Sequence, residues 1–136
     1  MKINFSNKNI LITGGSRGLG ASFAKKFISL NASNVFITGT KKNPPKWIKK
    51  SIYKKRIKYF QLDQYSKNFL INLKNFLKDK KKIDILINNA GININHNIVS
   101  LDYKILNKIL TVNLESAIQI ASLVSKFMIK KKSDLE

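Results

Sequence analysis

The chain of 136 residues contains no cysteine, one histidine and only seven acidic residues. The lack of cysteine excludes a disulfide framework and a metal site built on thiolates. The single histidine, His96, lies in a polar stretch without a second cluster of ligand-type residues, so we expect it to be solvated and expect no metal. No apolar run is long enough to cross a bilayer, and residues 1–10 lack the apolar core of a secretory signal peptide. We therefore expect a cytoplasmic protein with a single domain, residues 1–136.

Positive charge, in contrast, is in large excess: 26 Lys and Arg against 7 Asp and Glu give a net charge of +19. Such a charge favours an anionic partner, whether nucleic acid, a membrane surface, an acidic protein or a phosphate ligand. The lysines are scattered among many Asn and Ile residues, which is also typical of an AT-rich genome and a solvated surface. Because no nucleic-acid motif is present, and aromatic side chains do not alternate with the lysines, nucleic acid is the less favoured partner.

Apolar runs alternate along the chain with apolar residues at helical spacing. The runs predict strands over 8–13, 34–38, 57–62 and 83–87, and the helical spacing predicts helices over 16–30, 47–52 and 69–77, and from Asp102 onward. The last helix carries a long apolar stripe: Leu114, Ala117, Ile118, Ala121, Val124 and Met128. Strands that alternate with helices imply a parallel sheet with right-handed crossovers, an α/β fold.

A glycine-rich turn, TGGSRGLG from Thr13 to Gly20, joins the first predicted strand to the first predicted helix. Glycine tolerates the backbone angles of such a tight turn and leaves the backbone bare where a phosphate approaches. The amino end of the following helix offers free N–H groups and a partial positive charge. The placement of the turn between strand and helix therefore predicts a site for a dinucleotide pyrophosphate.

Three further signatures follow the glycine turn in order: Asp63 after the third strand, NNAG from Asn88 to Gly91 after the fourth, and Asn113 in the long helix. Together the four resemble the short-chain dehydrogenase/reductase family over essentially the whole chain. Taken singly, Asp63 could be a helix N-cap or turn residue, Asn88 and Asn89 ordinary turn residues, and Asn113 an asparagine at a helix kink. Their shared order and placement favour the family.

The resemblance implies a Rossmann-type doubly wound parallel sheet and a role for each matching residue. Asn113 matches the asparagine of the catalytic tetrad, and Asp63 matches the aspartate that contacts adenine. The cofactor-binding positions implied are Gly14, Ser16, Arg17, Gly18, Leu19, Gly20, Asp63, Asn89, Ala90 and Gly91.

The end of the second strand bears on the choice of cofactor. A carboxylate there usually binds the ribose 2′-hydroxyl of NAD, but Gly39 to Lys42 contain none. Thr40 and Lys41 could instead meet a 2′-phosphate, and Arg17 matches a basic residue that NADP-preferring members often carry. The sequence thus favours NADP over NAD, although these lysines could also reflect composition alone.

The chemistry of the family depends on a serine and on a Tyr-x-x-x-Lys pair, whose lysine lowers the pKa of the tyrosine. No tyrosine here has a lysine four residues later: the residues at that spacing from Tyr53, Tyr59, Tyr65 and Tyr103 are Ile57, Asp63, Phe69 and Asn107. In the family that pair follows a fifth strand. We therefore expect the cofactor-binding half of a reductase, truncated after the fourth strand and the long helix, and inactive alone.

Two consequences follow from the resemblance for the surface. The fourth strand would form an apolar sheet edge, which favours aggregation. The long helix forms part of a subunit interface in the family, so we expect a homo-oligomer or a full-length partner there.

Three functions remain open. TGGSRGLG, GTKK and NNAGI most resemble the 3-oxoacyl-[acyl-carrier-protein] reductases, which favours an NADP(H)-dependent oxidoreductase whose acidic acyl carrier meets Lys130 to Lys132. The alternative is a non-catalytic NADP(H)-binding module or a subunit of a larger complex, and a basic nucleic-acid-binding protein is the third.

Overall fold

A computed structural model describes residues 3–80, 82–95 and 97–133, so that His96 and Leu135–Glu136 lie outside the described residues. The strands are β1 (Asn9–Ile12), β2 (Asn34–Gly39), β3 (Ile57–Gln61) and β4 (Ile85–Ile87). The helices of the first half are α1 (Gly18–Ser29), the 3₁₀ turn η1 (Lys46–Lys49) and α2 (Ser51–Lys54). Those of the second half are α3 (Phe69–Lys78), the 3₁₀ turn η2 (Ile98–Ser100), α4 (Tyr103–Leu110), the π-helical turn η3 (Thr111–Glu115) and α5 (Ser116–Ser133).

The four strands form one parallel sheet in the order β3-β2-β1-β4. Leu11 of β1 lies beside Phe36 of β2 on one side and Leu86 of β4 on the other. The chain moves outward from β1 through β2 to β3, and then returns to place β4 on the other side of β1. The carboxyl ends of β1 and β4 therefore flank a topological switch point, where open α/β sheets bind ligands. The predicted Rossmann-type parallel sheet is confirmed.

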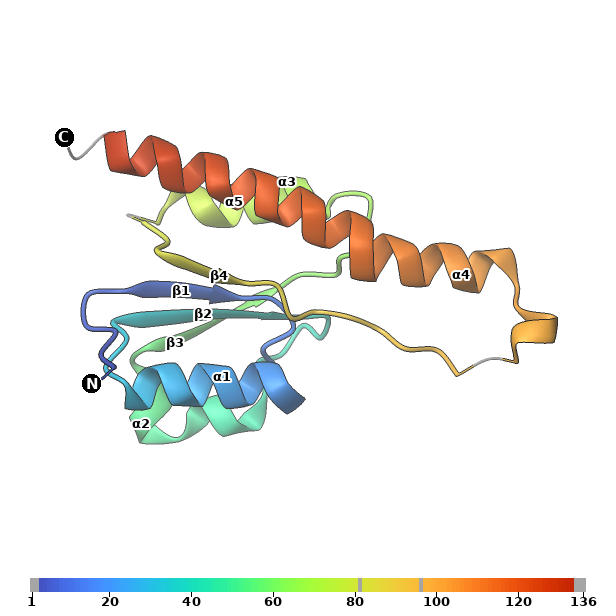
Figure 1. The fold of residues 1–136 in the computed structure, drawn as a ribbon. Helices are drawn as coiled ribbons and strands as arrows, with labels where there is room; N and C mark the ends of the chain where they lie inside the picture. The colour runs from blue at the N-terminus through green and yellow to red at the C-terminus, as the bar shows by residue number, and fades with distance from the viewer. Residues whose placement is uncertain (1–2, 81, 96, 134–136) are drawn as a thin grey trace.

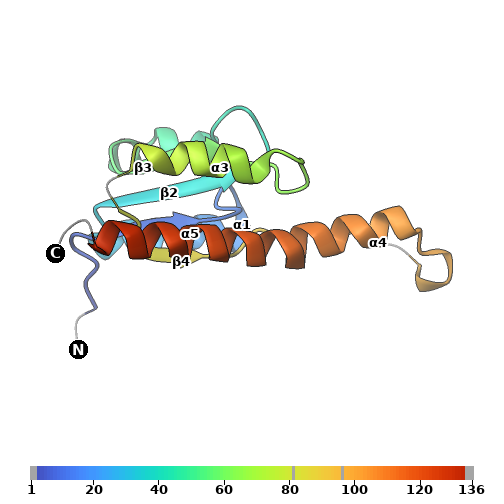
Figure 2. The same cartoon turned by 90° about the horizontal axis from the view of Figure 1, so that it is seen from above.

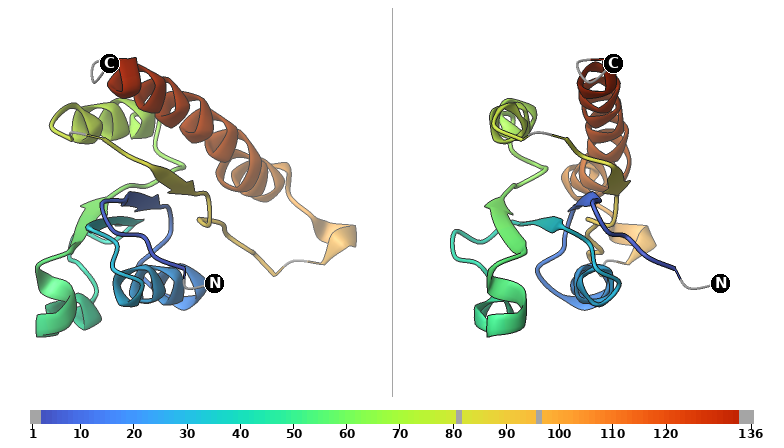
Figure 3. Two further views of the ribbon diagram at one scale, coloured as in Figure 1. Left: turned by 60° about the vertical axis from the view of Figure 1, so that its left-hand side comes forward. Right: turned by 90° about the vertical axis from the view of Figure 1, so that its left-hand side faces the viewer.

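Two layers of helices cover the sheet, α1 and α2 on one face and α3 and α5 on the other (Figures 1 and 3). Because side chains alternate along a strand, Ile10 and Ile12 are buried against the α1 face, whereas Leu11 is buried against the α3–α5 face. All three side chains have zero exposure. The continuous apolar run that predicts a buried strand thus fills two separate cores.

The last three helical elements form one long helix, in which η3 joins α4 to α5, and α4 projects beyond the carboxyl ends of the strands (Figure 2). Among the residues of this helix up to Lys130, Val112, Ser116, Ile120 and Val124 are buried, at a spacing of four residues. Leu114 and Ile118 of the apolar stripe predicted from the sequence are exposed, with exposed fractions of 55% and 61%, whereas Val124 of the same stripe is buried. Ser116 takes a buried place because its hydroxyl donates to the Val112 carbonyl at 2.7 Å.

The short helix predicted over 47–52 is two pieces, η1 and α2, separated at Lys50, which has extended backbone angles (φ −60°, ψ 136°). Both pieces lie on the α1 side of the sheet, where Ile48 is buried in the core. The other predicted elements differ only at their ends. In the part of the chain that the structure describes, no helix has the length and apolarity needed to cross a membrane.

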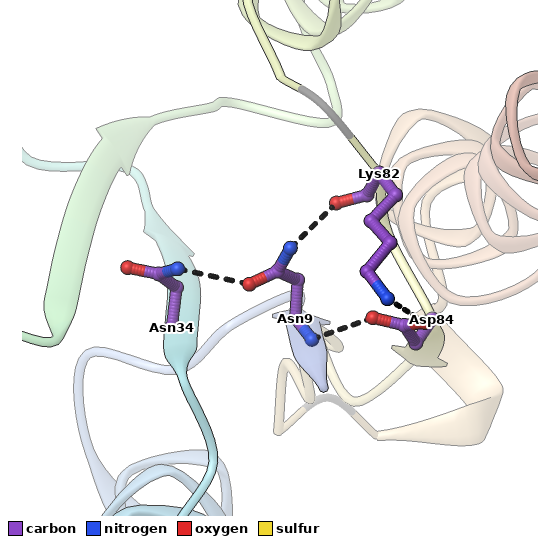
Figure 4. Close-up of polar contacts among 4 residues, drawn as sticks. All are labelled: Asn9, Asn34, Lys82 and Asp84. Carbon is purple, nitrogen blue, oxygen red and sulfur yellow. Dashed lines mark hydrogen bonds and ion pairs between the residues drawn. The ribbon is translucent and has the colours of Figure 1, made fainter. Parts of the chain in front are cut away.

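The amino ends of the strands are held together by the polar network of Figure 4. The backbone N–H of Asn9 donates to Asp84 Oδ2 at 2.7 Å, and the Asn9 side chain donates to the Lys82 carbonyl at 3.2 Å. Asn34 Nδ2 donates to Asn9 Oδ1 at 2.9 Å, and Lys82 Nζ lies 3.2 Å from Asp84 Oδ1. The network ties β2, β1 and β4 together at the end of the sheet opposite the switch point.

β4 forms one edge of the sheet, as expected from the sequence. Its three residues, Ile85 to Ile87, are only partly buried, whereas Ile10 to Ile12 of the adjacent β1 are fully buried. An apolar strand with one open edge offers unpaired N–H and C=O groups to another strand.

Candidate functional site

A cleft of about 490 Å³ opens at the carboxyl ends of the strands. Its wall comes from five segments far apart in the sequence: residues 14 and 16–19, 38–40, 62–65, 89–92, and Lys108 with Val112. The segments follow β1, β2, β3 and β4 in turn, and the long helix closes the remaining side. The cleft thus lies at the switch point that the strand order creates.

The glycine turn forms the floor of the cleft between β1 and α1. Gly14 has φ +64°, and a Cβ atom there would lie 2.7 Å from the Ala90 Cα atom. Gly18 has φ +55°, but open space surrounds the place of its Cβ. A Cβ at Gly20 would lie 2.5 Å from Asn89 Nδ2. Gly14 and Gly20 therefore allow close packing against the NNAG segment, whereas Gly18 leaves its backbone open to the cleft.

Thr13 and Asn89 connect the glycine turn to the end of β4. The buried Thr13 hydroxyl accepts from the backbone N–H groups of Asn89 and Ala90, both at 3.0 Å. Asn89 Nδ2 donates in return to the carbonyls of Thr13 and Gly14, at 3.0 and 3.1 Å. Thr38 of β2 adds a third contact, because its Oγ1 accepts from Gly14 N at 3.1 Å. The three strand ends are therefore fixed as one unit beneath the cleft.

Asp63 lines the cleft after β3 and also shapes its own turn. Its Oδ1 accepts from the backbone N–H of Tyr65 at 3.0 Å. It is not a helix N-cap, because the N-cap residue of α3 is Asn68, five residues later. Asp63 can therefore both shape its own turn and face a ligand, because only one of its two carboxylate oxygens accepts from Tyr65.

The remaining candidate residues differ in whether they line the cleft. Arg17 lines the cleft from the N-cap position of α1, and Thr40 lines it from the loop after β2. Leu19 also lines it, with 64% of its side chain exposed. Lys41 is exposed and is not part of the cleft wall, so its contact with a cofactor stays a prediction. Gly20 is buried and is not part of the cleft wall either.

Similarity to a known family identifies the family of this chain. The family model for short chain dehydrogenases matches residues 8–134. The chain belongs to this family. FabG, a 3-oxoacyl-[acyl-carrier-protein] reductase of Chlamydia trachomatis, is 33% identical over 131 residues, which make up 93% of this chain and 52% of that protein. The chain thus spans about half the length of the curated relatives it matches.

Solved structures of short-chain dehydrogenases have the same fold. A 3-oxoacyl (acyl-carrier-protein) reductase of Agrobacterium tumefaciens with NADP bound matches with a TM-score of 0.84 and 24% identity, over 96% of this chain and 51% of that one. A short-chain dehydrogenase of Leptospira borgpetersenii with bound NAD⁺ matches with a TM-score of 0.76 and 26% identity, over 89% of this chain and 46% of that one. The family resemblance predicted from the four signatures is confirmed.

Asn113, which we expect to match the asparagine of the family's catalytic tetrad, lies in the π-helical turn η3. Both ends of its side-chain amide bind the backbone of Ile92, and Ile92 in turn lines the cleft. Nearby, Asn88 Nδ2 donates to the Ala117 carbonyl at 3.0 Å. Asparagines of the NNAG segment and of η3 therefore fix the long helix to the end of β4. π-helical turns occur frequently at functional sites.

Several residues of the wall were not predicted from the sequence. They are Thr38, Gly39, Leu62, Gln64, Tyr65, Ile92, Lys108 and Val112. Most are direct sequence neighbours of residues that were predicted to bind the cofactor, and this proximity in sequence is the signal that could have identified them. Lys108 had no such signal, because it reaches the wall only through the direction of the long helix. Its Nζ lies 5.3 Å from the centroid of the Tyr65 ring.

The donor groups of the cleft fit a dinucleotide. No side chain caps the amino end of α1, and its first turn contains no acidic residue. Free N–H groups and the positive end of the helix dipole therefore lie beside the open backbone of Gly18, which suits a pyrophosphate. Within the described residues no group of three His, Cys, Asp or Glu side chains could hold a metal ion.

Proposed function

We propose that the cleft binds a nicotinamide dinucleotide, with NADP(H) preferred over NAD(H). The observation that carries the proposal is the uncapped amino end of α1 beside Gly18, whose backbone is open to the cleft. A negatively charged pyrophosphate is stabilised there by N–H groups that no side chain satisfies. On this proposal, the Asp63 carboxylate, which lines the cleft after β3, would accept a hydrogen bond from the adenine base.

The preference for NADP(H) rests on charge near the carboxyl end of β2. Arg17 and Thr40 line the cleft there, and the segment from Gly39 to Lys42 contains no carboxylate. A guanidinium attracts a 2′-phosphate and can bind two of its oxygens. The matching reductase of Agrobacterium tumefaciens holds NADP and the matching dehydrogenase of Leptospira borgpetersenii holds NAD⁺, so the family fold accommodates both.

A dinucleotide bound here would supply hydride transfer to or from a carbonyl or alcohol. The residues of this chain would bind it: the glycine turn at the pyrophosphate, and Asn89, Ala90 and Gly91 beside the central part of the cleft. Asn113 would act by fixing Ile92 and hence the wall that follows β4. Because the sequence contains no Tyr-x-x-x-Lys, we propose that the chain alone transfers no hydride.

The relatives named 3-oxoacyl-[acyl-carrier-protein] reductase favour a reductase of that type, with an acidic acyl carrier as partner of the basic surface. The cytoplasmic location also stays a prediction. The second candidate function is a non-catalytic NADP(H)-binding module or subunit. It is favoured by the exposed apolar residues of the long helix, Leu114 and Ile118, which a second copy or a full-length partner would cover.

The experiment is a fluorescence titration of the folded chain with NADPH and NADH. We expect saturable binding that is tighter for NADPH. Gly18→Asp places a carboxylate where the pyrophosphate would lie and should abolish binding, and Asp is among the residues that tolerate a positive φ. Asn75→Asp adds the same charge on an exposed position of α3 and should bind as the unaltered chain does. Absence of binding to the folded chain would contradict the proposal.

A further inference from the structure

Three backbone carbonyls at the edge of the cleft each accept a hydrogen bond from a side chain behind its wall. The donor–acceptor pairs are Trp47 Nε1 to the Ser16 carbonyl at 2.9 Å, Gln61 Nε2 to the Thr40 carbonyl at 3.0 Å, and the Tyr59 hydroxyl to the Lys41 carbonyl. Ser16 and Thr40 line the cleft, but Trp47, Tyr59 and Gln61 are not part of its wall. Each of the three carbonyl oxygens therefore accepts from a side chain that is not part of the cleft wall.

The three donors come from two elements that meet behind the cleft. Tyr59 and Gln61 are two residues apart on β3, so both project from the same face of the strand. They hold two consecutive carbonyls of the loop after β2. Trp47 comes from η1, where Tyr53 packs against its ring edge to face at 5.7 Å and Lys25 Nζ lies 5.1 Å from its centroid.

Gly39 lies at the centre of this arrangement. A Cβ atom there would lie 3.0 Å from Ser16 Oγ and 3.0 Å from the Tyr59 hydroxyl. The glycine turn, the loop after β2 and Tyr59 are thus packed against one another without spare volume. A side chain at residue 39 would therefore disturb both Ser16 and Tyr59.

A carbonyl oxygen carries partial negative charge and opposes the approach of a phosphate, whereas N–H groups, hydroxyls and cations favour it. With the function proposed above as its basis, we propose that Trp47, Tyr59 and Gln61 are positioning residues for recognition of the 2′-phosphate of NADP(H). They fix three carbonyls away from the phosphate and so leave hydroxyl and guanidinium groups to face it. None of the three is part of the cleft wall, so each would act through the carbonyl that it binds.

The protonation state of Tyr59 suits this role. Burial raises the pKa of the Tyr59 hydroxyl above its usual value of 10.0, so the group stays a neutral donor at physiological pH. A phenolate would instead repel the Lys41 carbonyl.

The test measures the dissociation constants of NADPH and NADH for the full chain and for Tyr59→Phe, Trp47→Phe and Gln61→Met. Each substitution removes one donor and keeps most of the side-chain volume. Tyr53→Phe is the matched control, because it removes a tyrosine hydroxyl from the same layer without touching the three carbonyls. Gln61 is exposed, so Gln61→Met keeps the test valid where a variant of a more buried donor does not fold.

We expect the preference for NADPH over NADH to fall by about three- to tenfold in each variant, the effect of one hydrogen bond. The affinity for NADH should change little, and Tyr53→Phe should keep the full preference. A loss of equal size for both cofactors would show a purely structural role and overturn the inference while leaving the proposed function intact. A chain that prefers NADH would also overturn it. Failure of the folded chain to bind either nucleotide would instead refute the proposed function together with this inference.

Discussion

Asn113 and Ile92 form a closed pair across 21 residues of sequence. Asn113 Oδ1 accepts from the Ile92 N–H at 2.8 Å, and Asn113 Nδ2 donates to the Ile92 carbonyl at 2.8 Å. The pair connects the π-helical turn of the long helix to the segment that follows β4. Because Ile92 lines the cleft, the shape of the cleft depends on an asparagine that lies outside its wall.

Replacement of Asn113 tests this connection. Asn113→Asp keeps the shape of the side chain but places a carboxylate against the Ile92 carbonyl, so we expect a loss of about 1–2 kcal/mol of stability at neutral pH. Protonation of the new carboxyl restores a donor, so the loss should shrink as the pH falls. Urea denaturation followed by circular dichroism measures it, with Asn107→Asp on exposed α4 as the control. Equal stability of Asn113→Asp and the unaltered chain at neutral pH would refute the connection.

Thr13→Val removes the hydroxyl that joins the glycine turn to the NNAG segment. The side chain is 1% exposed, and valine has nearly the same shape, so the substitution leaves the N–H groups of Asn89 and Ala90 without their acceptor. We expect a loss of roughly 2 kcal/mol. Thr111→Val loses only an exposed hydroxyl contact to Glu115 at 3.3 Å and should cost much less. Thermal denaturation measures the loss of stability in both variants. Losses of similar size would contradict the role of the Thr13 hydroxyl.

Gly14→Ala and Gly18→Ala distinguish a glycine required for packing of the fold from one required for cofactor binding. Both positions have positive φ, which costs an alanine about 1–2 kcal/mol. At Gly14 the new methyl group would also clash with the Ala90 Cα atom, so we expect a much larger loss of stability there. At Gly18 the methyl group meets open space, and the chain should fold but bind NADPH more weakly. The account fails if the two variants lose equal stability.

The exposed apolar residues of the long helix predict self-association. Ile118 is 61% exposed on α5, and Ile52 is 62% exposed on α2, on the other face of the sheet. If the long helix is the interface, Ile118→Lys should shift the chain toward monomer, whereas Ile52→Lys should not. Sedimentation velocity at several protein concentrations measures the shift. An equal response of the two variants would show that association is unspecific, for instance through the edge of β4.

The sequence predicted the fold well, because local patterns govern it. The four strands, the parallel sheet and the exposed position of β4 follow from apolar runs between helices and from the family resemblance. The apolar stripe of the long helix is visible in the sequence, but hydrophobicity alone cannot tell that Val124 is buried while Leu114 and Ile118 stay exposed. Ser116 is buried there only because its hydroxyl finds a backbone acceptor.

The site was predicted in part for a similar reason. Gly14, Gly18 and Asp63 occupy positions fixed by strand ends, which a sequence motif records. Lys41 follows Thr40 directly in the loop after β2, but only Thr40 is part of the cleft wall. The bond from Tyr59 to the Lys41 carbonyl left no mark in the sequence, because a tyrosine on a strand is typical of an ordinary core position.

The cleft at the carboxyl ends of the strands is the proposed dinucleotide site. The most direct test follows the amide chemical shifts of the ¹⁵N-labelled chain during a titration with NADP⁺. The account predicts saturable shifts at residues 14–20, 38–40 and 89–92, and none at Asn9 and Asp84 at the opposite end of the sheet. Shifts confined to other surfaces, or no shifts from a folded chain at saturating nucleotide, would contradict it.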